Sequence, residues 1–165
     1  MILLCGCMNV AHTLDMELKR RPRRAVLQEG QPIPPDERAD PAVRRRMSGP
    51  ALRAFFNVAG AWRLSGEEQR ALLGWPPEST FYKYKAGQCG TLPFDMLIRI
   101  SLVLGIYKAL HILYPEPELA DRWVNLPNAN ALFGGRPALA TMTDAGIDGL
   151  FQVRRLLDSR RGGWN

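Results

Sequence analysis

The segment from Leu64 to Gly90 constrains the fold more than any other part of the chain, because its capping and turn residues define two short helices. Ser65 is a good N-cap, and Glu68 three residues later completes the pattern of a capping box, so the first helix begins at Ser65. Gly74 can adopt the positive φ that ends a helix, and the two prolines that follow can open the next helix. We therefore predict a tight turn and a second helix over residues 77–86.

The predicted second helix has an anchoring face and a polar face. Phe81 shares one face with Tyr84 or Lys85, at spacings of three and four residues. In a DNA-binding helix-turn-helix, the outward N-terminal residues of the second helix reach base edges in the major groove, and lysines bind phosphates. The residues expected to contact DNA are Ser79, Thr80, Tyr82 and Lys83, with Lys85 on the DNA backbone.

Two observations leave other interpretations of this segment open. An ordinary helical hairpin with a basic, solvated face would give the same local pattern. The common repressor pattern also places a small residue four positions before the turn glycine, whereas this chain has Arg70 there and Ala71 one position later. We therefore expect a turn that is longer than usual.

Composition indicates a folded protein with a polyanionic partner. The chain has 165 residues, of which 46% are hydrophobic, enough for one ordinary domain or two small ones. Its net charge is +6, and half of that charge lies in residues 1–46. The cysteines number three, and two of them lie close to the N-terminus, so neither a disulfide framework nor a zinc site is expected. A reduced, cytoplasmic setting follows.

Neither secretion nor membrane insertion is expected. The first ten residues are mildly apolar, but no basic region precedes the apolar run. We expect no segment to approach the length of a membrane span.

Residues 1–46 are expected to form a basic, flexible arm. Two arginine-rich clusters, Lys19–Arg24 and Arg44–Arg46, flank a stretch in which prolines block regular structure. Such an arm either adds phosphate contacts that weaken with salt or has no role. Order is expected to begin near Ser48 or Pro50.

Residues 47–114 are expected to form the helix-turn-helix module, with four or five helices around one core. After the second helix of the motif, apolar residues recur at helical spacing, and Asp95 and Arg99 form an i, i+4 pair on the other face. Gly105 is interpreted as a helix break. The last helix should end at Tyr114, because the following proline disfavours a helical conformation there.

Residues 115–165 differ from the preceding module in composition. They contain paired glycines, prolines at the starts of segments and one final amphipathic helix. Thr143 or Asp144 is expected to cap that helix, and Gly162-Gly163 to end it. Its apolar stripe consists of Ile147, Leu150, Val153 and Leu157. The region has more aromatic and apolar side chains than it can bury alone, so they either dock on the first module or form a partner surface.

The chain shows no strand-like alternation of useful length, so the predicted fold class is all-α. It also shows no cluster of nucleophile, base or metal ligands, no phosphate loop and no dinucleotide fingerprint. His111 lies beside apolar residues and is expected to be structural, and Cys89 has no neighbouring base in the sequence. We therefore expect no enzyme activity, no metal and no cofactor.

The order of these predicted helices and motifs resembles that found in the MbcA/ParS/Xre antitoxin family of bacterial type II toxin–antitoxin systems. The resemblance lies in LSGEEQRALLG at 64–74, RISLVLGIYKALHILYP at 99–115, WVNLPNANALFGGRPALATM at 123–142 and VRRLLDSRRGGW at 153–164. It leaves the basic arm unexplained. The motif that contains FGG, a proline and a methionine and is followed by a terminal helix is a more specific signature of this family than the helix-turn-helix is.

The resemblance implies an Xre-like helix-turn-helix module followed by a small α-helical region that binds a toxin. The toxin would be a RES-domain protein that consumes NAD, and the antitoxin would block its active cleft. It also implies repression of the antitoxin's own operon. Carried over by position, the toxin-binding residues are Trp123, Asn128, Phe133, Gly134, Gly135, Arg136, Pro137, Met142, Arg155 and Trp164.

These residues also have a purely structural interpretation. Trp123, Phe133 and Met142 would then be core residues, and the glycine pair would be only a turn, whereas Arg136 is hard to bury without a partner. Three functions remain in competition: an antitoxin with both activities, a helix-turn-helix regulator without a toxin, and a toxin-binding protein that has lost DNA binding. Homodimers, and higher-order complexes with toxin, are expected because paired half-sites raise specificity.

Overall fold

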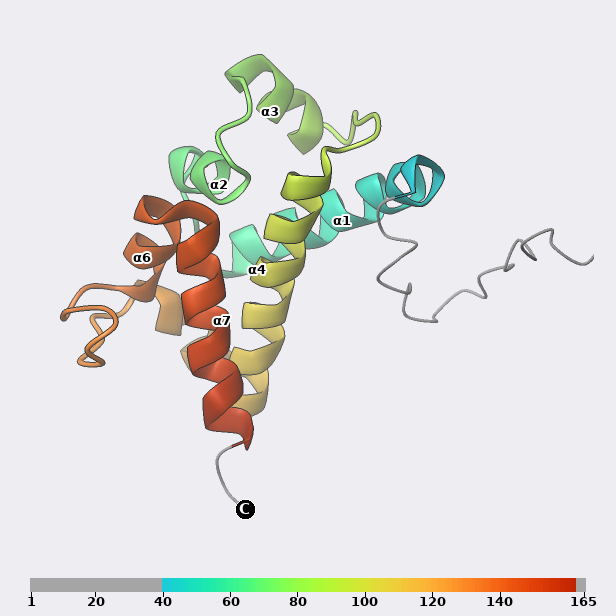
Figure 1. Ribbon diagram of the computed structural model, residues 1–165. Coiled ribbons are helices and arrows are strands. Elements are labelled where there is room, and N and C mark those ends of the chain that lie inside the picture. Colours follow the sequence, from blue (N-terminus) through green and yellow to red (C-terminus); the bar gives the residue numbers. More distant parts are fainter. Residues whose placement is uncertain (1–39, 163–165) are drawn as a thin grey trace, which may run out of the picture. The chain divides into compact units, whose positions relative to one another are not determined.

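The protein is described by a computed structural model that covers residues 40–162, and Figure 1 shows its helices in chain order. Within this range all regular elements are helical, which confirms the predicted all-α class. The cluster Lys19–Arg24 and Trp164 lie outside the described residues. The elements are α1 (Pro41–Ala61), α2 (Gly66–Leu72), α3 (Glu78–Lys85), α4 (Phe94–Leu113), α5 (Pro117–Arg122), the 3₁₀-helix η2 (Trp123–Asn125), α6 (Ala138–Asp144) and α7 (Gly146–Gly162).

Helix α1 begins at Pro41, so the prediction that order begins near Ser48 or Pro50 was wrong. The carboxylate of Asp40 accepts a hydrogen bond of 2.7 Å from the main-chain N–H of Ala42, and proline is well suited to the first helical position. Pro50 lies inside the helix rather than at its start. The arginines 44–46, assigned to the arm, are therefore part of a helix.

The helix-turn-helix has the capping that its sequence predicts. The main-chain N–H of Ser65 donates to the Glu68 carboxylate at 2.7 Å, and the N–H of Glu68 donates to the Ser65 hydroxyl at 3.2 Å. Gly74 has a φ of 85°. Helix α3 then runs over Glu78–Lys85, within one residue of the predicted bounds.

Helix α4 is continuous, so the predicted break at Gly105 was wrong. Gly105 instead lets the guanidinium group of Arg154 on α7 lie close to the backbone of α4, because a Cβ at residue 105 would overlap that group. The helix ends at Tyr114, which is extended (φ −120°, ψ 109°), as the following proline predicts. The predicted ion pair between Asp95 and Arg99 is present at 2.8 Å.

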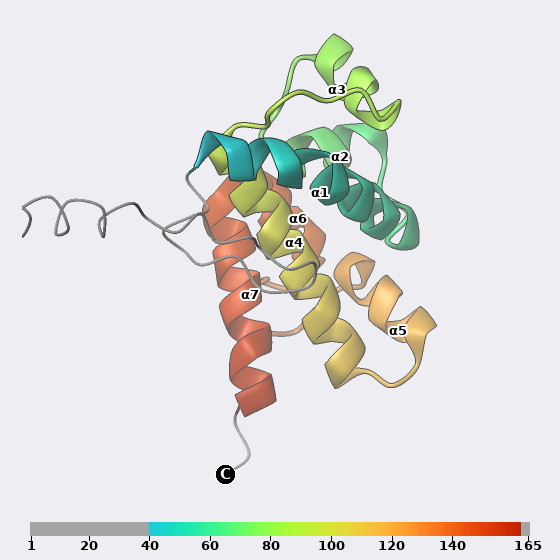
Figure 2. The ribbon, with the colours of Figure 1, turned by 90° about the vertical axis from the view of Figure 1, so that its right-hand side faces the viewer.

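The prediction that no segment approaches the length of a membrane span was wrong for α4. By length and apolar composition alone, this 20-residue helix could cross a membrane. However, it packs against α1, α5 and α7, and Figure 2 shows it between α5 and α7. Its apolar residues are therefore those of a central core helix in the described part of the chain.

One hydrophobic core joins the helix-turn-helix module to the C-terminal helices. Phe55 of α1, Leu72 of α2 and Ile106 of α4 belong to the same cluster of buried residues as Met142 of α6 and Leu157 of α7. The exposed fraction of these five side chains is zero. The C-terminal apolar residues therefore dock on the first module, which was one of the two predicted possibilities.

The last two helices meet at a sharp corner. Helix α7 has the predicted apolar stripe, in which Leu150, Val153 and Leu157 are fully buried. The prediction that Thr143 or Asp144 caps this helix was wrong, because both residues lie in the last turn of α6. There the Thr143 hydroxyl hydrogen-bonds back to the carbonyl oxygens of α6.

Candidate DNA-binding and toxin-binding surfaces

Helix α3 has the two faces that its sequence predicts. The Phe81 side chain is buried and packs on Phe56 of α1, with ring centroids 6.0 Å apart. On the other face Ser79 and Lys83 are exposed, and Tyr82 is 59% exposed. The anchored aromatic ring therefore holds a polar face outward, toward solvent.

The other two residues predicted to contact DNA, Thr80 and Lys85, differ in their exposure to solvent. Thr80 is half-buried, whereas Lys85 is exposed and holds its ammonium group 5.7 Å from the centroid of the Phe81 ring. Tyr84, on the anchoring side, is half-buried, and burial together with the nearby Cys89 raises the pKa of its phenol.

Arg70 explains how the long turn between α2 and α3 is held. Its guanidinium Nε and Nη2 atoms donate to the main-chain carbonyl of Pro76 at 3.3 and 3.2 Å. The same group lies 5.7 Å from the centroid of the Trp75 ring. A small residue at position 70 could make none of these contacts.

Trp75 is the residue in this turn that sequence reasoning missed. Its φ is 58°, in the left-handed region that is a genuine outlier for a bulky residue, and its side chain is 54% exposed. The only signal in the sequence was its position directly after Gly74. Strained and exposed residues of this kind collect at functional sites.

The segment between η2 and α6 forms a loop closed at its base by an isolated antiparallel bridge between Pro127 and Pro137. The Asn128 side chain accepts a hydrogen bond of 3.0 Å from the N–H of Asn130, and the Asn130 side chain accepts one of 2.9 Å from the N–H of Leu132. These side chains replace a regular hydrogen-bond ladder. The loop thus has a defined shape.

Three of the predicted toxin-binding residues are core residues. Trp123 and Phe133 are 7% and 3% exposed and make an edge-to-face contact at 5.9 Å, and Met142 is fully buried. An interface anchor must be accessible to its partner, and these side chains are not. They fix the loop to the core instead, as the structural interpretation predicts.

The glycine pair and Arg136 are exposed and lie in the part of this loop that leads into its base at Pro137. Gly134 and Gly135 have φ values of 56° and 83°, and an added Cβ would meet no atom within 4 Å at either position. The left-handed backbone, rather than crowding, therefore requires glycine there. Because no side chain covers this backbone, a partner can approach it closely.

Arg136 is exposed and forms an ion pair with Asp144 on α6, with an N–O distance of 2.7 Å. Both side chains are more than half exposed, so the pair contributes little to stability and can be exchanged for another partner. Arg155 on α7 is also exposed and lies over the ring of Phe151 at 5.9 Å. Pro137 is half-buried beside Arg136.

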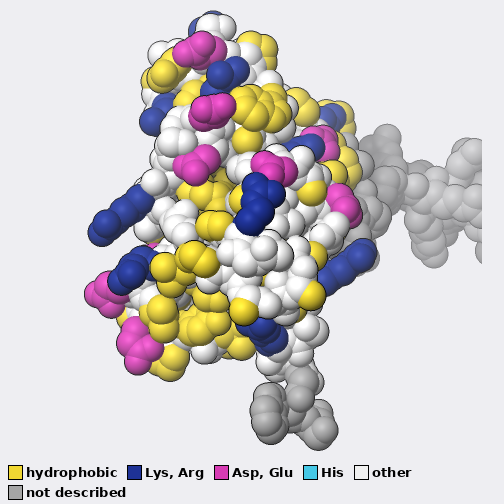
Figure 3. Space-filling view, turned by 90° about the vertical axis from the view of Figure 1, so that its left-hand side faces the viewer, with side chains coloured by type: hydrophobic (Ala, Val, Ile, Leu, Met, Phe, Trp, Pro, Cys, Tyr) yellow, Lys and Arg dark blue, Asp and Glu magenta, His cyan; other side chains and the backbone are white. Residues whose placement is uncertain are grey.

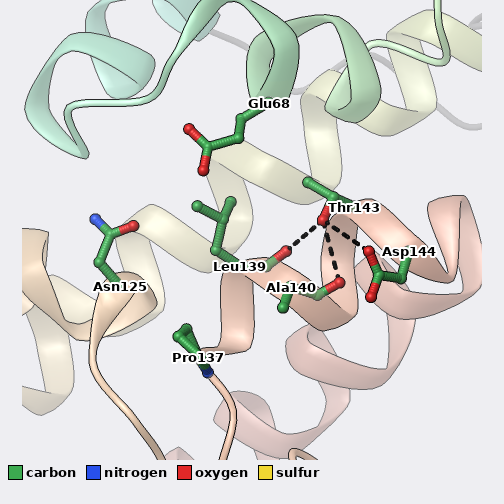
Figure 4. A pocket seen from close by; sticks show the side chains of 7 residues that line it. All are labelled: Glu68, Asn125, Pro137, Leu139, Ala140, Thr143 and Asp144. Carbon is green, nitrogen blue, oxygen red and sulfur yellow. Dashed lines mark hydrogen bonds between the residues drawn. The ribbon is translucent and has the colours of Figure 1, made fainter.

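A hollow of about 250 Å³ lies where α2 faces α6, and Figure 4 shows its lining. Glu68, which caps α2, points toward this hollow from the helix-turn-helix side. Asp144, the partner of Arg136, lies on the opposite side. The hollow thus lies between α2 of the helix-turn-helix and α6 of the C-terminal region. Its lining residues are Glu68, Asn125, Pro137, Leu139, Ala140, Thr143 and Asp144.

The surface that includes the side of α6 combines apolar and charged areas. In Figure 3, hydrophobic side chains gather on the lower part of this face, with basic and acidic side chains around them. Ile112, Leu119 and Phe151 of the C-terminal half are 37–52% exposed. An apolar centre with a charged edge is the usual composition of a protein-binding surface.

His111 has the structural surroundings that its sequence position predicts. Its Nε2 lies 2.8 Å from the Asp121 carboxylate, and its ring lies 4.3 Å from that of Tyr107. Burial, together with the charge of Asp121, raises the pKa of Tyr107. Between residues 40 and 162 no three His, Cys, Asp or Glu side chains gather as metal ligands would.

Two protein-family models match successive parts of the chain. Residues 41–105 match the antitoxin Xre-like helix-turn-helix domain, and residues 109–163 match the antitoxin Xre/MbcA/ParS C-terminal toxin-binding domain. A protein of Sinorhizobium fredii (strain NBRC 101917 / NGR234), named Uncharacterized protein y4oB, is 46% identical over 112 residues, which cover 68% of this chain and 84% of the relative. No solved structure gave a match.

The two matched domains follow one another in the order that the sequence resemblance predicts, and the described helices account for both. The protein is therefore an antitoxin with a helix-turn-helix domain and a toxin-binding domain. The chain belongs to the Xre/MbcA/ParS antitoxin family.

Proposed function

We propose that this antitoxin neutralises a RES-domain toxin that consumes NAD, by covering the toxin's active cleft. The observation that carries the proposal is the exposed Arg136 next to the uncovered Gly134-Gly135 backbone, inside the matched toxin-binding domain. A guanidinium group suits a cleft that binds an anionic dinucleotide, because it pairs with phosphate or carboxylate groups in two-pronged geometry. The buried Phe133, directly before the glycine pair, holds this segment against the core.

The burial of individual side chains divides the predicted toxin-binding residues into two roles. We propose direct contact for the accessible members of the set, which are Asn128, Gly134, Gly135, Arg136, Pro137 and Arg155. Trp123, Phe133 and Met142 support the loop from the core. Trp164 stays a proposed contact, although it lies outside the described residues.

We further propose that the helix-turn-helix represses the antitoxin's own operon, as a homodimer and in higher-order complexes with toxin. Ser79, Thr80, Tyr82 and Lys83 would read the operator, and Lys85 would bind its backbone. In this assignment residues 47–114 bind DNA, residues 115–165 bind toxin, and residues 1–46 add basic charge. The setting is the cytoplasm, where operator and toxin are both present, and no catalysis is assigned to this chain.

Two alternatives make different predictions. A stand-alone regulator would have no use for a toxin-binding domain, which the chain matches over residues 109–163. An antitoxin that has lost DNA binding would agree with the unusual turn around Trp75 but would not need the exposed polar face of α3. Both alternatives are separated from the main proposal by measuring toxin binding and DNA binding on the same preparation.

The test is co-expression of the full chain with the product of the neighbouring gene, followed by an NAD-consumption assay on that product. We expect a stable complex in which NAD loss is suppressed. R136A should weaken the complex at least about tenfold, the value of one charge-assisted hydrogen bond. R53A is the matched control, because Arg53 is an exposed arginine of α1 in the other module.

The possible failures are distinct. A neighbour that neither binds nor consumes NAD would reject the RES-toxin proposal. A complex that R136A and R53A affect equally would keep the antitoxin but reject the assigned contact surface. Loss of toxin binding together with loss of the folded helical signal would show that Arg136 acts through stability.

A further inference from the structure

A basic cleft lies between the first half of α1 and the loop that follows α3. It has a volume of about 450 Å³ and is lined by Arg45, Arg46, Gly49, Pro50, Cys89, Gly90 and Thr91. Its two sides are 39 residues or more apart in sequence. Figure 2 shows the start of α1 beside the segment that joins α3 to α4.

Buried hydrogen bonds fix the two sides of this cleft to each other. The main-chain N–H of Leu92 donates to the Ser48 hydroxyl at 2.9 Å, and that hydroxyl donates to the carbonyl of Arg44 at 2.7 Å. Ser48 is 1% exposed. The cleft is therefore a preformed feature, rather than a gap between independent segments.

The chemistry of the lining selects an anion. Arg45 and Arg46 are exposed, and no carboxylate lines the cleft. Within residues 40–162, neither arginine takes part in an ion pair. Thr91 adds an exposed hydroxyl group, and Gly49 and Gly90 leave parts of the wall without side chains. Paired guanidinium groups and a hydroxyl are common ligands of a phosphodiester.

The position of the cleft indicates which anion it serves. The loop 89–91 lies in the short segment that joins α3 to α4, and the exposed face of α3 is assigned to the major groove. A duplex read by α3 therefore has backbone phosphates close to this loop. We propose that Arg45, Arg46 and Thr91 clamp a phosphodiester of the operator backbone beside the groove that α3 enters. The inference rests on the proposed DNA-binding function and extends it to α1.

The experiment compares DNA affinity of full-chain variants over a series of salt concentrations. Fluorescence anisotropy is measured on two labelled duplexes, the promoter of the antitoxin's own operon and a scrambled version. For R45A/R46A we expect both affinities to fall about ten- to a hundredfold at 0.1 M salt, with their ratio unchanged. The slope of log K against log salt should fall by about 0.9 for each lost phosphate contact.

A matched control removes the same charge elsewhere. Arg160 and Arg161 lie at the C-terminal end of α7, which Figure 1 shows at the opposite end of the helices from α3, so R160A/R161A should change both affinities less than threefold. T91V keeps the shape of Thr91 and should weaken both complexes a few-fold. Circular dichroism melting of each variant checks that α1 remains folded.

The outcomes separate this inference from the function on which it depends. An unchanged salt slope in R45A/R46A, or equal losses in both double variants, would overturn the clamp while leaving α3 as the DNA reader. An effect of R45A/R46A on toxin binding alone would overturn it in favour of an acidic protein surface. Wild-type protein that binds neither duplex would reject the DNA-binding proposal, and the clamp with it.

Discussion

The side-chain amide of Asn125 donates a hydrogen bond of 2.8 Å to the main-chain carbonyl of Trp62. Trp62 caps the end of α1 in the helix-turn-helix domain, and Asn125 ends the 3₁₀-helix in the toxin-binding domain. This bond crosses the boundary between the two matched domains. It therefore satisfies a helix-end carbonyl of one domain with a side chain of the other.

The Asn125–Trp62 bond predicts that the two domains lose stability together. N125A should lower the free energy of unfolding by about 1 kcal/mol, because the Trp62 carbonyl loses its partner. Urea denaturation followed by circular dichroism measures this, with N57A, on the exposed side of α1, as control. A change in N125A no larger than in N57A would show that the bond contributes nothing.

Two glycines inside helices should respond oppositely to alanine. In G149A the new Cβ would overlap the main-chain carbonyl oxygen of Thr141 in α6, so the α6–α7 corner must shift, at a cost of about 1–3 kcal/mol. In G105A the obstacle is the mobile end of the Arg154 side chain, and alanine favours the helix by up to about 1 kcal/mol.

Thermal melts of the two variants test this contrast directly. We expect G149A to melt at a lower temperature than wild type, and G105A at the same or a higher temperature. If G105A is destabilised as much as G149A, the guanidinium of Arg154 cannot leave its place beside α4.

The left-handed conformation of Trp75 predicts a difference between two truncations. Both W75A and W75G remove the indole and its contact with Arg70, but only glycine adopts a φ of 58° without strain. We expect W75G to be more stable than W75A by about 1 kcal/mol. Chemical denaturation of both variants gives the comparison, and equal stability would mean that the turn relaxes out of this conformation.

Burial of two tyrosines predicts a loss of stability at alkaline pH. The pKa values of Tyr84 and Tyr107 are raised in the folded protein, mainly by burial. In the unfolded chain these phenols ionise near pH 10, so their contribution is complete below that pH and is lost as the pH rises through the folded pKa. Y84F/Y107F should therefore lose less stability than wild type above pH 10.

Urea midpoints at pH 7, 9 and 10.5 test this dependence. Between pH 7 and 9 the difference between wild type and Y84F/Y107F should stay constant. A parallel decline of both proteins above pH 10 would show that other groups govern the alkaline behaviour.

Local signals in the sequence were sufficient for the helix-turn-helix. The capping box at Ser65 and Glu68, the turn at Gly74 and the anchoring Phe81 depend on neighbours within a few residues, and the structure confirms all of them. The direction of the exposed polar face of α3 follows from Phe81, because one buried aromatic ring fixes the rotation of a short helix.

Long-range contacts explain what the sequence could not predict. Gly105 resembles a helix break until Arg154, 49 positions later, is known to lie against it. The burial of Trp123 and Met142 depends on the core that the C-terminal region shares with the first module, which periodicity within the C-terminal region does not reveal. The start of α1 was misplaced because proline was interpreted as a breaker, although Pro41 opens the helix and Pro50 is accommodated within it.

Helix α4 contains the border between the two matched domains, which fall at residues 41–105 and 109–163. This single uninterrupted helix packs against α1 of the helix-turn-helix domain and against α7 of the toxin-binding domain. Exchanging toxin specificity between relatives therefore cannot be done by joining chains at the border. A functional chimera should inherit α4 whole, together with the side chains of α1 and α7 that pack against it.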